Sequence, residues 1–211
     1  MVGVAPAAAE VSSAGRGERV VVRSDELSQD IRSAVYVVNR YWARHWSQFF
    51  PGGYDPPTVV GSYNGNSARR PVCAGQPLYS YNASYCMQQH FIAWDINLLK
   101  MGYAEGDAWV YQIIAHEWAH AVQNRVPGRY VSVKVELQAD CLAGATLVGA
   151  ARDGTLTWER SDSQEIAAAL SYRAGDTPWT NPLDHGTARQ RIDAFAKGAR
   201  GGVPACFPGR F

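Results

Sequence analysis

The chain has 211 residues, of which 46% are hydrophobic and 18% are charged. This composition can build the packed core of one ordinary domain, and it excludes a wholly disordered chain. The 20 basic and 19 acidic residues give a net charge of +1, which argues against a protein that works mainly by coating nucleic acid or an acidic membrane. No apolar run approaches the roughly 20 residues that a membrane-spanning helix needs, so we expect no stable membrane insertion.

The first 24 residues are predicted to form a flexible tail. Residues 1–9 are small and apolar and end in three alanines, like the end of a signal peptide, although no Lys or Arg precedes them. Residues 12–17 are small, polar and rich in glycine, a composition typical of flexible linkers. We expect one domain to follow over residues 25–211.

The domain is predicted to be α+β, with a long helix first, then short strands, then a mostly helical C-terminal half. In the first helix, apolar residues recur at three- and four-residue steps until Pro51 ends it. Residues 51–89 are rich in Gly, Pro, Asn and Ser, as expected for turns and short strands. Asp107 stands where the N-cap of a later helix should be. The expected helices are 28–50, 108–126, 133–152, 161–173 and 184–200, and the expected strands are 58–63 and 90–96.

The sequence His116-Glu117-Trp118-Ala119-His120 is an H-E-x-x-H pattern inside an apolar predicted helix. Four residues along a helix bring two side chains to within about 40° of each other and about 6 Å along the axis. His116 and His120 can therefore bind one Zn²⁺ ion, with Glu117 placed beside them as a general base. The alternative is a pair of histidines satisfied by ordinary hydrogen bonds, but such groups would be costly to bury on this apolar helix without partners.

Two acidic residues, Glu136 and Asp140, also lie four residues apart, on the next predicted helix. A catalytic zinc ion needs a third protein ligand and an open position. The simplest assignment makes Glu136 that ligand and lets Asp140 accept a hydrogen bond from the far nitrogen of a ligand histidine. The two acids could exchange these roles, or they could be an exposed pair without function.

The four cysteines allow three disulfide pairings, and none of their spacings is typical of a zinc or thioredoxin motif. We favour Cys73–Cys86, because the intervening segment is short and rich in turn residues, which leaves Cys141–Cys206 as the second pair. Two disulfides would indicate an oxidising, extracytoplasmic or secreted location. Four free thiols in a cytosolic protein remain the alternative.

Three segments together resemble the putative neutral zinc metallopeptidase family of bacteria, over roughly residues 28–207. They begin at His116, at Glu136 and at Asp184, and read HEWAHAVQ, ELQADCLAG and DHGTARQR. The cysteine positions also resemble that family. Residues 51–89 have few counterparts in it, and Trp118 and Ala119 depart from the smaller or more polar residues expected there.

This resemblance implies a zincin-like fold, with a small twisted sheet whose edge strand lies over the H-E-x-x-H helix and could bind an extended peptide. Residues 90–96 are the candidate for that strand, although an interior strand is equally consistent with the sequence. Similar zincins place a histidine or arginine after the glutamate helix to stabilise an oxyanion. His185 could take that catalytic role, or it could be a helix cap or a surface residue.

The predicted function is that of a zinc-dependent endopeptidase, with Glu117 and His185 as catalytic residues and with His116, His120 and Glu136 as metal ligands. Its partner would be a peptide or protein substrate and its cofactor Zn²⁺. A zinc-binding protein without catalysis, or a zinc hydrolase of another amide, remains an alternative. No basic stripe with interleaved aromatic residues supports nucleic-acid binding. The sequence leaves the oligomeric state open.

Overall fold

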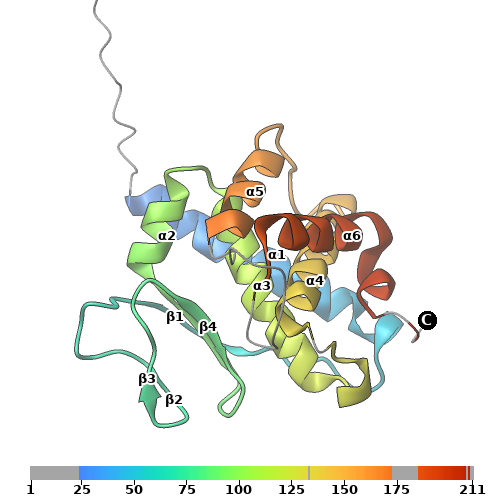
Figure 1. Ribbon diagram of the computed structural model, residues 1–211, viewed down its shortest axis with the longest axis horizontal. Helices are drawn as coiled ribbons and strands as arrows, with labels where there is room; N and C mark the ends of the chain where they lie inside the picture. Colours follow the sequence, from blue (N-terminus) through green and yellow to red (C-terminus); the bar gives the residue numbers. More distant parts are fainter. Residues whose placement is uncertain (1–23, 133, 173–184, 208, 210–211) are drawn as a thin grey trace, which may run out of the picture.

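The computed structural model describes residues 24–132, 134–172, 185–207 and 209, and it combines helices with small sheets (Figure 1). The predicted α+β class is therefore confirmed. The helices are α1 (Ser24–Phe49), α2 (Ile96–Tyr103), α3 (Ala108–Arg125), the short 3-10 helix η1 (Gly128–Tyr130), α4 (Val135–Arg152), α5 (Asp162–Tyr172) and α6 (Ala188–Cys206). The strands are β1 (Thr58–Tyr63), β2 (Val72–Cys73), β3 (Gln76–Pro77), β4 (Ala83–Cys86) and β5 (Phe91–Asp95).

The main sheet has three strands in the order β1-β5-β4. Strand β5 is fully buried and lies in the centre, parallel to β1 and antiparallel to β4. The proposal that residues 90–96 form the edge strand beside the site is therefore wrong. The strand that lies at the edge and packs against α3 is β4. Strands β2 and β3 form a separate two-stranded hairpin.

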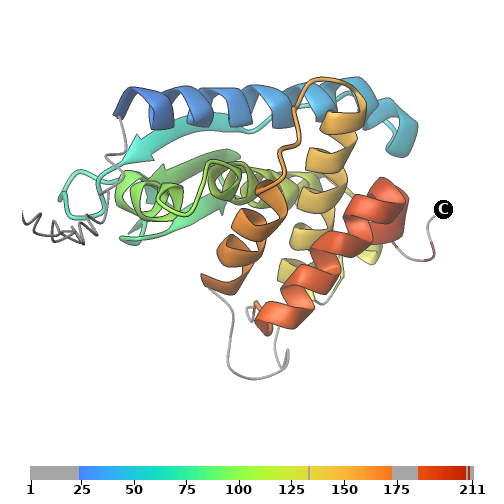
Figure 2. The ribbon, with the colours of Figure 1, turned by 90° about the horizontal axis from the view of Figure 1, so that it is seen from above.

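The helices bury their apolar faces around α3, whose side chains are buried on several sides. The sheet and α2 lie at one end of the molecule, whereas α4, α5 and α6 gather at the other (Figures 1 and 2). Helix α1 runs along one side and packs on both α3 and α4. Its core residues recur at helical spacing, among them Val38, Trp42 and Trp46.

Helices α4 and α6 approach each other to backbone distance because glycines face each other where they cross. A Cβ atom added to Gly198 would lie 1.7 Å from the carbonyl oxygen of Cys141, and one added to Gly144 would lie 2.1 Å from that of Phe195. No larger residue fits at either position without moving a helix. This close approach brings the first turn of α6 against α4.

All five predicted helices are present, and their ends differ for local reasons. The expected N-cap, Asp107, makes no side-chain cap hydrogen bond, and Glu165 of α5 instead accepts from the backbone N–H of Ala108 at 3.0 Å. Helix α6 begins at residue 188 rather than 184, because Thr187 and Gln190 form a reciprocal capping box. Helix α2 was not predicted at all; Asp95 caps it by accepting from the backbone N–H of Asn97.

Both predicted disulfides are confirmed, and no described cysteine is free. Cys73 is bonded to Cys86 between β2 and β4, and Cys141 is bonded to Cys206 between α4 and the end of α6. Two such bonds indicate an oxidising environment. Within the described ranges, no helix is both long and apolar enough to cross a membrane. The predicted tail over residues 1–24 falls almost entirely outside the described residues, and the division into tail and domain stays a prediction.

Candidate metal centre

Helix α3 presents His116, Glu117 and His120 in its middle turns, where the chain is surrounded by other elements. His116 is 5% exposed and Glu117 is 8% exposed. The Nε2 atoms of His116 and His120 lie 3.2 Å apart. The four-residue spacing therefore places both imidazoles on one face, as the helical period requires.

Helix α4 adds the carboxylate of Glu136 to the two imidazoles. Its Oε2 atom lies 3.1 Å from Nε2 of His116 and 3.5 Å from Nε2 of His120. Atoms bound to one zinc ion at about 2.0–2.1 Å, at tetrahedral angles, lie about 3.3–3.4 Å apart. The three edges of this triangle match that spacing, so the donor set has the size and chemistry of a zinc site.

Asp140 lies one turn further along α4 and is completely buried. Its Oδ1 atom is 2.8 Å from Nδ1 of His116, and Arg191 of α6 donates to both of its oxygens, at 2.8 and 2.9 Å. Since a carboxylate can only accept, Nδ1 of His116 carries a proton, which leaves Nε2, towards Glu136, as the atom that a metal would bind. With both oxygens engaged in this way, Asp140 is poorly placed to act as a metal ligand itself.

His120 has a different partner on its far nitrogen. Its Nδ1 atom lies 2.8 Å from Oε1 of Gln123, which is one turn further along α3 and is 5% exposed. The two histidines are thus supported by different groups, one a carboxylate and the other an amide.

The charges around the triangle favour a cation at its centre. Burial lowers the pKa of His116, but Asp140 and Glu136 more than offset this and raise its pKa to about 10. For Glu136, burial raises the pKa, yet hydrogen bonds from His116 and His120 hold it well below the ordinary range. The pKa of Asp140 is also lowered, because Arg191 and His116 outweigh the effect of burial. Both carboxylates are ionised around the imidazoles.

Glu117 lies beside the triangle and faces the edge strand. The backbone of Tyr85 in β4 lies near its carboxylate and slightly lowers its pKa. Burial and the nearby Glu136 raise its pKa, while His116 and His120 act in the opposite direction with a smaller effect. A carboxylate that holds a proton more readily than usual suits a group that must accept and release one near neutral pH.

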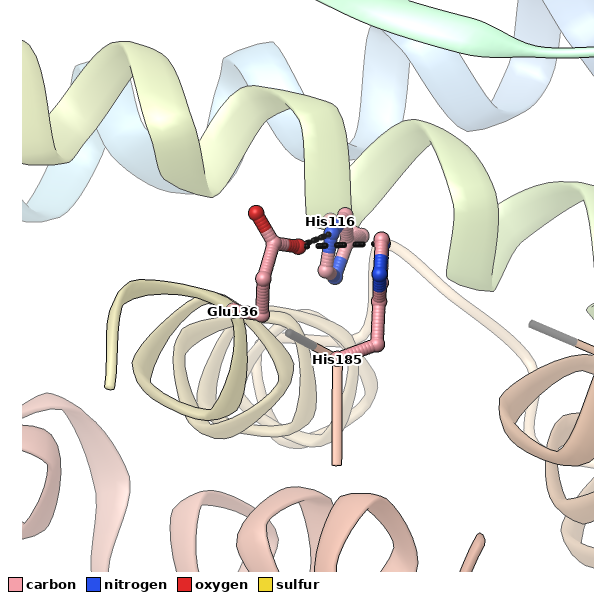
Figure 3. A group of neighbouring side chains, drawn as sticks. All are labelled: His116, Glu136 and His185. Atoms are coloured by element: carbon pink, nitrogen blue, oxygen red, sulfur yellow. Dashed lines mark hydrogen bonds and ion pairs between the residues drawn. The ribbon is translucent and has the colours of Figure 1, made fainter. Parts of the chain in front are cut away.

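His185 lies just before α6, and its Nε2 atom is 3.3 Å from Oε2 of Glu136. Figure 3 shows the side chains of His116 and His185 directed toward the Glu136 carboxylate. The ligand atoms of these three residues lie within 4.8 Å of one another, so His185 also has the position of a metal ligand. Burial lowers the pKa of His185, which favours the neutral ring. Its side chain is 39% exposed, more than those of the other groups of the site.

A cleft of about 420 Å³ opens onto these groups. The site residues line it, together with the edge strand β4 and Asn82 before it. Three helices add apolar residues to the lining: Leu98 of α2, Ile113 of α3, and Ala169 and Tyr172 of α5. The cleft can therefore admit an extended chain with an apolar side chain.

Residues 128–207 match the model of the putative neutral zinc metallopeptidase family. The match supports the family that the motifs predicted. No curated protein and no solved structure matches the chain.

The zinc metallopeptidase match covers only part of the candidate centre. It includes Glu136, Asp140, His185 and Arg191, and it begins after the end of α3, so the H-E-x-x-H segment precedes it. The match supports zinc as the cofactor and a hydrolase as the class of enzyme. The structure brings together all five predicted site residues. From the sequence alone, neither Gln123 nor Arg191 had a predicted role.

Proposed function

We propose that the protein is a zinc-dependent endopeptidase, in which His116, His120 and Glu136 hold the metal and Glu117 is the general base. The observation that supports this most strongly is the triangle of ligand atoms, with edges of 3.1, 3.2 and 3.5 Å, beside an open cleft. Glu136 is preferred to Asp140 as the third ligand because the oxygens of Asp140 already bind Arg191 and His116.

Zinc bound to the triangle would supply Lewis-acid chemistry, which polarises the scissile carbonyl and makes a water molecule more acidic. Glu117 takes the proton from the attacking water and later gives it to the leaving amine. Its buried position and raised pKa suit both steps. His185, at the mouth of the site, donates to the oxyanion that forms on the carbonyl oxygen.

Strand β4 is the proposed support for the substrate backbone, in place of the strand expected from the sequence. Among the residues that the structure describes, it pairs with β5 on one side and with no strand on the other. Tyr85 lies near Glu117 and lines the same cleft, so β4 borders the site. An extended peptide added to this edge would lie along the cleft, held by main-chain hydrogen bonds. The two disulfides support secretion as the setting in which this occurs.

The test combines metal analysis with a peptidase assay. Purified protein should contain about one zinc per chain by elemental analysis and should cleave a mixed peptide library in a reaction that a chelator stops. Glu117→Gln should retain the zinc but lose about 10²–10⁴-fold in kcat, whereas Glu136→Ala should lose the metal. A Glu117→Gln variant that cleaves as well as the wild type would refute the mechanism.

The same assay separates the two alternatives. A zinc-binding protein without catalysis would retain its metal and cleave no peptide. A zinc hydrolase of another amide would leave the peptide library intact but turn over small amides, with the same dependence on zinc and on Glu117.

A further inference from the structure

Gln123 is the group that contacts the ring nitrogen of His120 on the side away from Glu136. Besides the 2.8 Å contact between its Oε1 atom and Nδ1 of His120, its Nε2 atom donates to the carbonyl oxygen of Val135 at 2.9 Å and to Oε1 of Gln138 at 3.1 Å. Both ends of this buried amide are therefore engaged. The orientation of the amide decides which nitrogen of His120 carries the proton.

Gln138 of α4 is also buried, and four groups surround its amide. Its Oε1 atom accepts from the backbone N–H of Ser132 at 2.9 Å, as well as from Gln123. Its Nε2 atom donates to the carbonyl oxygens of Tyr130, at 2.9 Å, and Cys206, at 3.0 Å. A backbone N–H can only donate and a carbonyl can only accept, so the amide of Gln138 has one satisfied orientation.

The fixed orientation of the Gln138 amide in turn fixes that of Gln123 and the protonated nitrogen of His120. These three residues form a hydrogen-bond relay that ends at the candidate metal centre. Because Oε1 of Gln138 needs a donor, it faces the NH₂ group of Gln123, and the carbonyl of Val135 requires the same arrangement. Oε1 of Gln123 then faces His120 and can only accept. Nδ1 of His120 must therefore carry a proton, which leaves Nε2 as the atom that a metal would bind.

We propose that Gln123 and Gln138 are positioning residues that set the tautomer and ring orientation of His120 for zinc binding. The inference rests on the proposed function. The direction of the whole relay is set by backbone groups in the segment that joins α3 to α4 and by the carbonyl of Cys206, which the disulfide to Cys141 holds against α4. A group that hydrogen-bonds the ring nitrogen of a ligand histidine that does not bind the metal commonly contributes 10- to 100-fold to metal affinity.

The test measures the zinc dissociation constant of the full chain by competition with a chromophoric chelator. Gln123→Met and Gln138→Met keep the size of each side chain but remove the amide, and each should raise the dissociation constant about 10- to 100-fold. The double variant should lose little more zinc affinity than either single variant, since both changes break the same hydrogen-bond relay. Gln123→Asn, whose amide is one methylene shorter, should weaken zinc binding in the same way and serves if a methionine variant fails to fold.

The matched control is Val110→Ala, which lies on the same helix and is fully buried. It should lower thermal stability and leave the zinc dissociation constant within about two-fold of the wild type, because it touches no part of the relay. If Val110→Ala weakens zinc as much as Gln123→Met, zinc affinity only follows fold stability and the positioning role is refuted. If Gln123→Met and Gln138→Met both bind zinc as tightly as the wild type, the relay is refuted and the proposed function is not. A wild type that binds no zinc refutes the proposed function.

Discussion

Arg191 provides a sharp test of the buried charges behind the candidate site. Its side chain is 4% exposed, and it donates to both oxygens of the fully buried Asp140, at 2.8 and 2.9 Å. Arg191→Met keeps the aliphatic stem and removes the guanidinium group. Asp140 then retains His116 and Gln112 as donors but loses its cation.

The expected cost follows from two lost hydrogen bonds to a charged group. Such bonds contribute about 1.5–3 kcal/mol each, and removing one partner of a buried ion pair costs about 3–5 kcal/mol in total. For a chain of this size, each kcal/mol corresponds to about 2–4 °C, so Tm should fall by about 6–20 °C. Arg191→Lys, which keeps the charge but not the paired geometry, should give an intermediate loss.

The assay is thermal and urea unfolding in the presence of a chelator, so that bound metal does not contribute. Arg189 is the matched control, since it lies on the same helix, has a side chain that is 88% exposed and pairs with Asp193 four residues away. Arg189→Met should lower the free energy of unfolding by less than about 0.5 kcal/mol. If Arg191→Met costs no more than Arg189→Met, the Asp140 carboxylate does not depend on its ion pair and the reasoning is refuted.

Three further outcomes follow from the site and its surroundings. His185→Ala should retain about one zinc per chain and lose about 10²–10³-fold in kcat; loss of the metal would instead make His185 a ligand. Asp107→Asn should be more stable than the wild type at pH 7, by under about 1 kcal/mol, because burial, Asp30 and Glu165 raise the pKa of Asp107 in the folded state. A raised carboxyl pKa lowers stability as pH rises through the unfolded and folded values, so the advantage should vanish in urea titrations below about pH 4. Peptide-library profiling should show a preference for an apolar side chain beside the scissile bond, and Ile113→Ala should change it; equal cleavage of charged and apolar peptides would contradict this.

The candidate metal ligands could be picked out from the sequence because each pair is local. His116 and His120 are four residues apart on one helix, and so are Glu136 and Asp140, so the helical period alone places each pair on one face. The disulfide pairing was also accessible, because Cys73 and Cys86 close a short loop. These predictions needed no knowledge of how distant segments pack.

The edge strand was wrongly predicted because strand order depends on pairing between distant segments. Residues 91–95 are strongly apolar, and that pattern signals a strand buried on both faces. The structure places it in the centre of the sheet, between a parallel and an antiparallel neighbour. The true edge, β4, has only four residues in a segment rich in turn residues, so its own sequence carries little signal.

The contacts that support the site could not be predicted from the sequence, because they too depend on how distant segments pack. Arg191 meets Asp140 only because α6 folds back onto α4, and Gln138 reaches the carbonyl of Cys206 across 68 positions in the chain. Gln123 did carry a signal, as a polar residue on an apolar helix three positions after His120. A buried amide at that spacing from a ligand histidine is a reasonable candidate for a supporting contact.

The glycine crossing of α4 and α6 has a consequence for how inherited or engineered variation would act. Alanine at Gly144 or Gly198 adds a single methyl group at a place that touches neither metal ligand nor cleft. It would nevertheless push the helices apart and draw the guanidinium of α6 away from the carboxylate behind His116. In a random mutagenesis screen, such changes would be scored with the inactive variants of the catalytic motif, although their lesion lies in the scaffold.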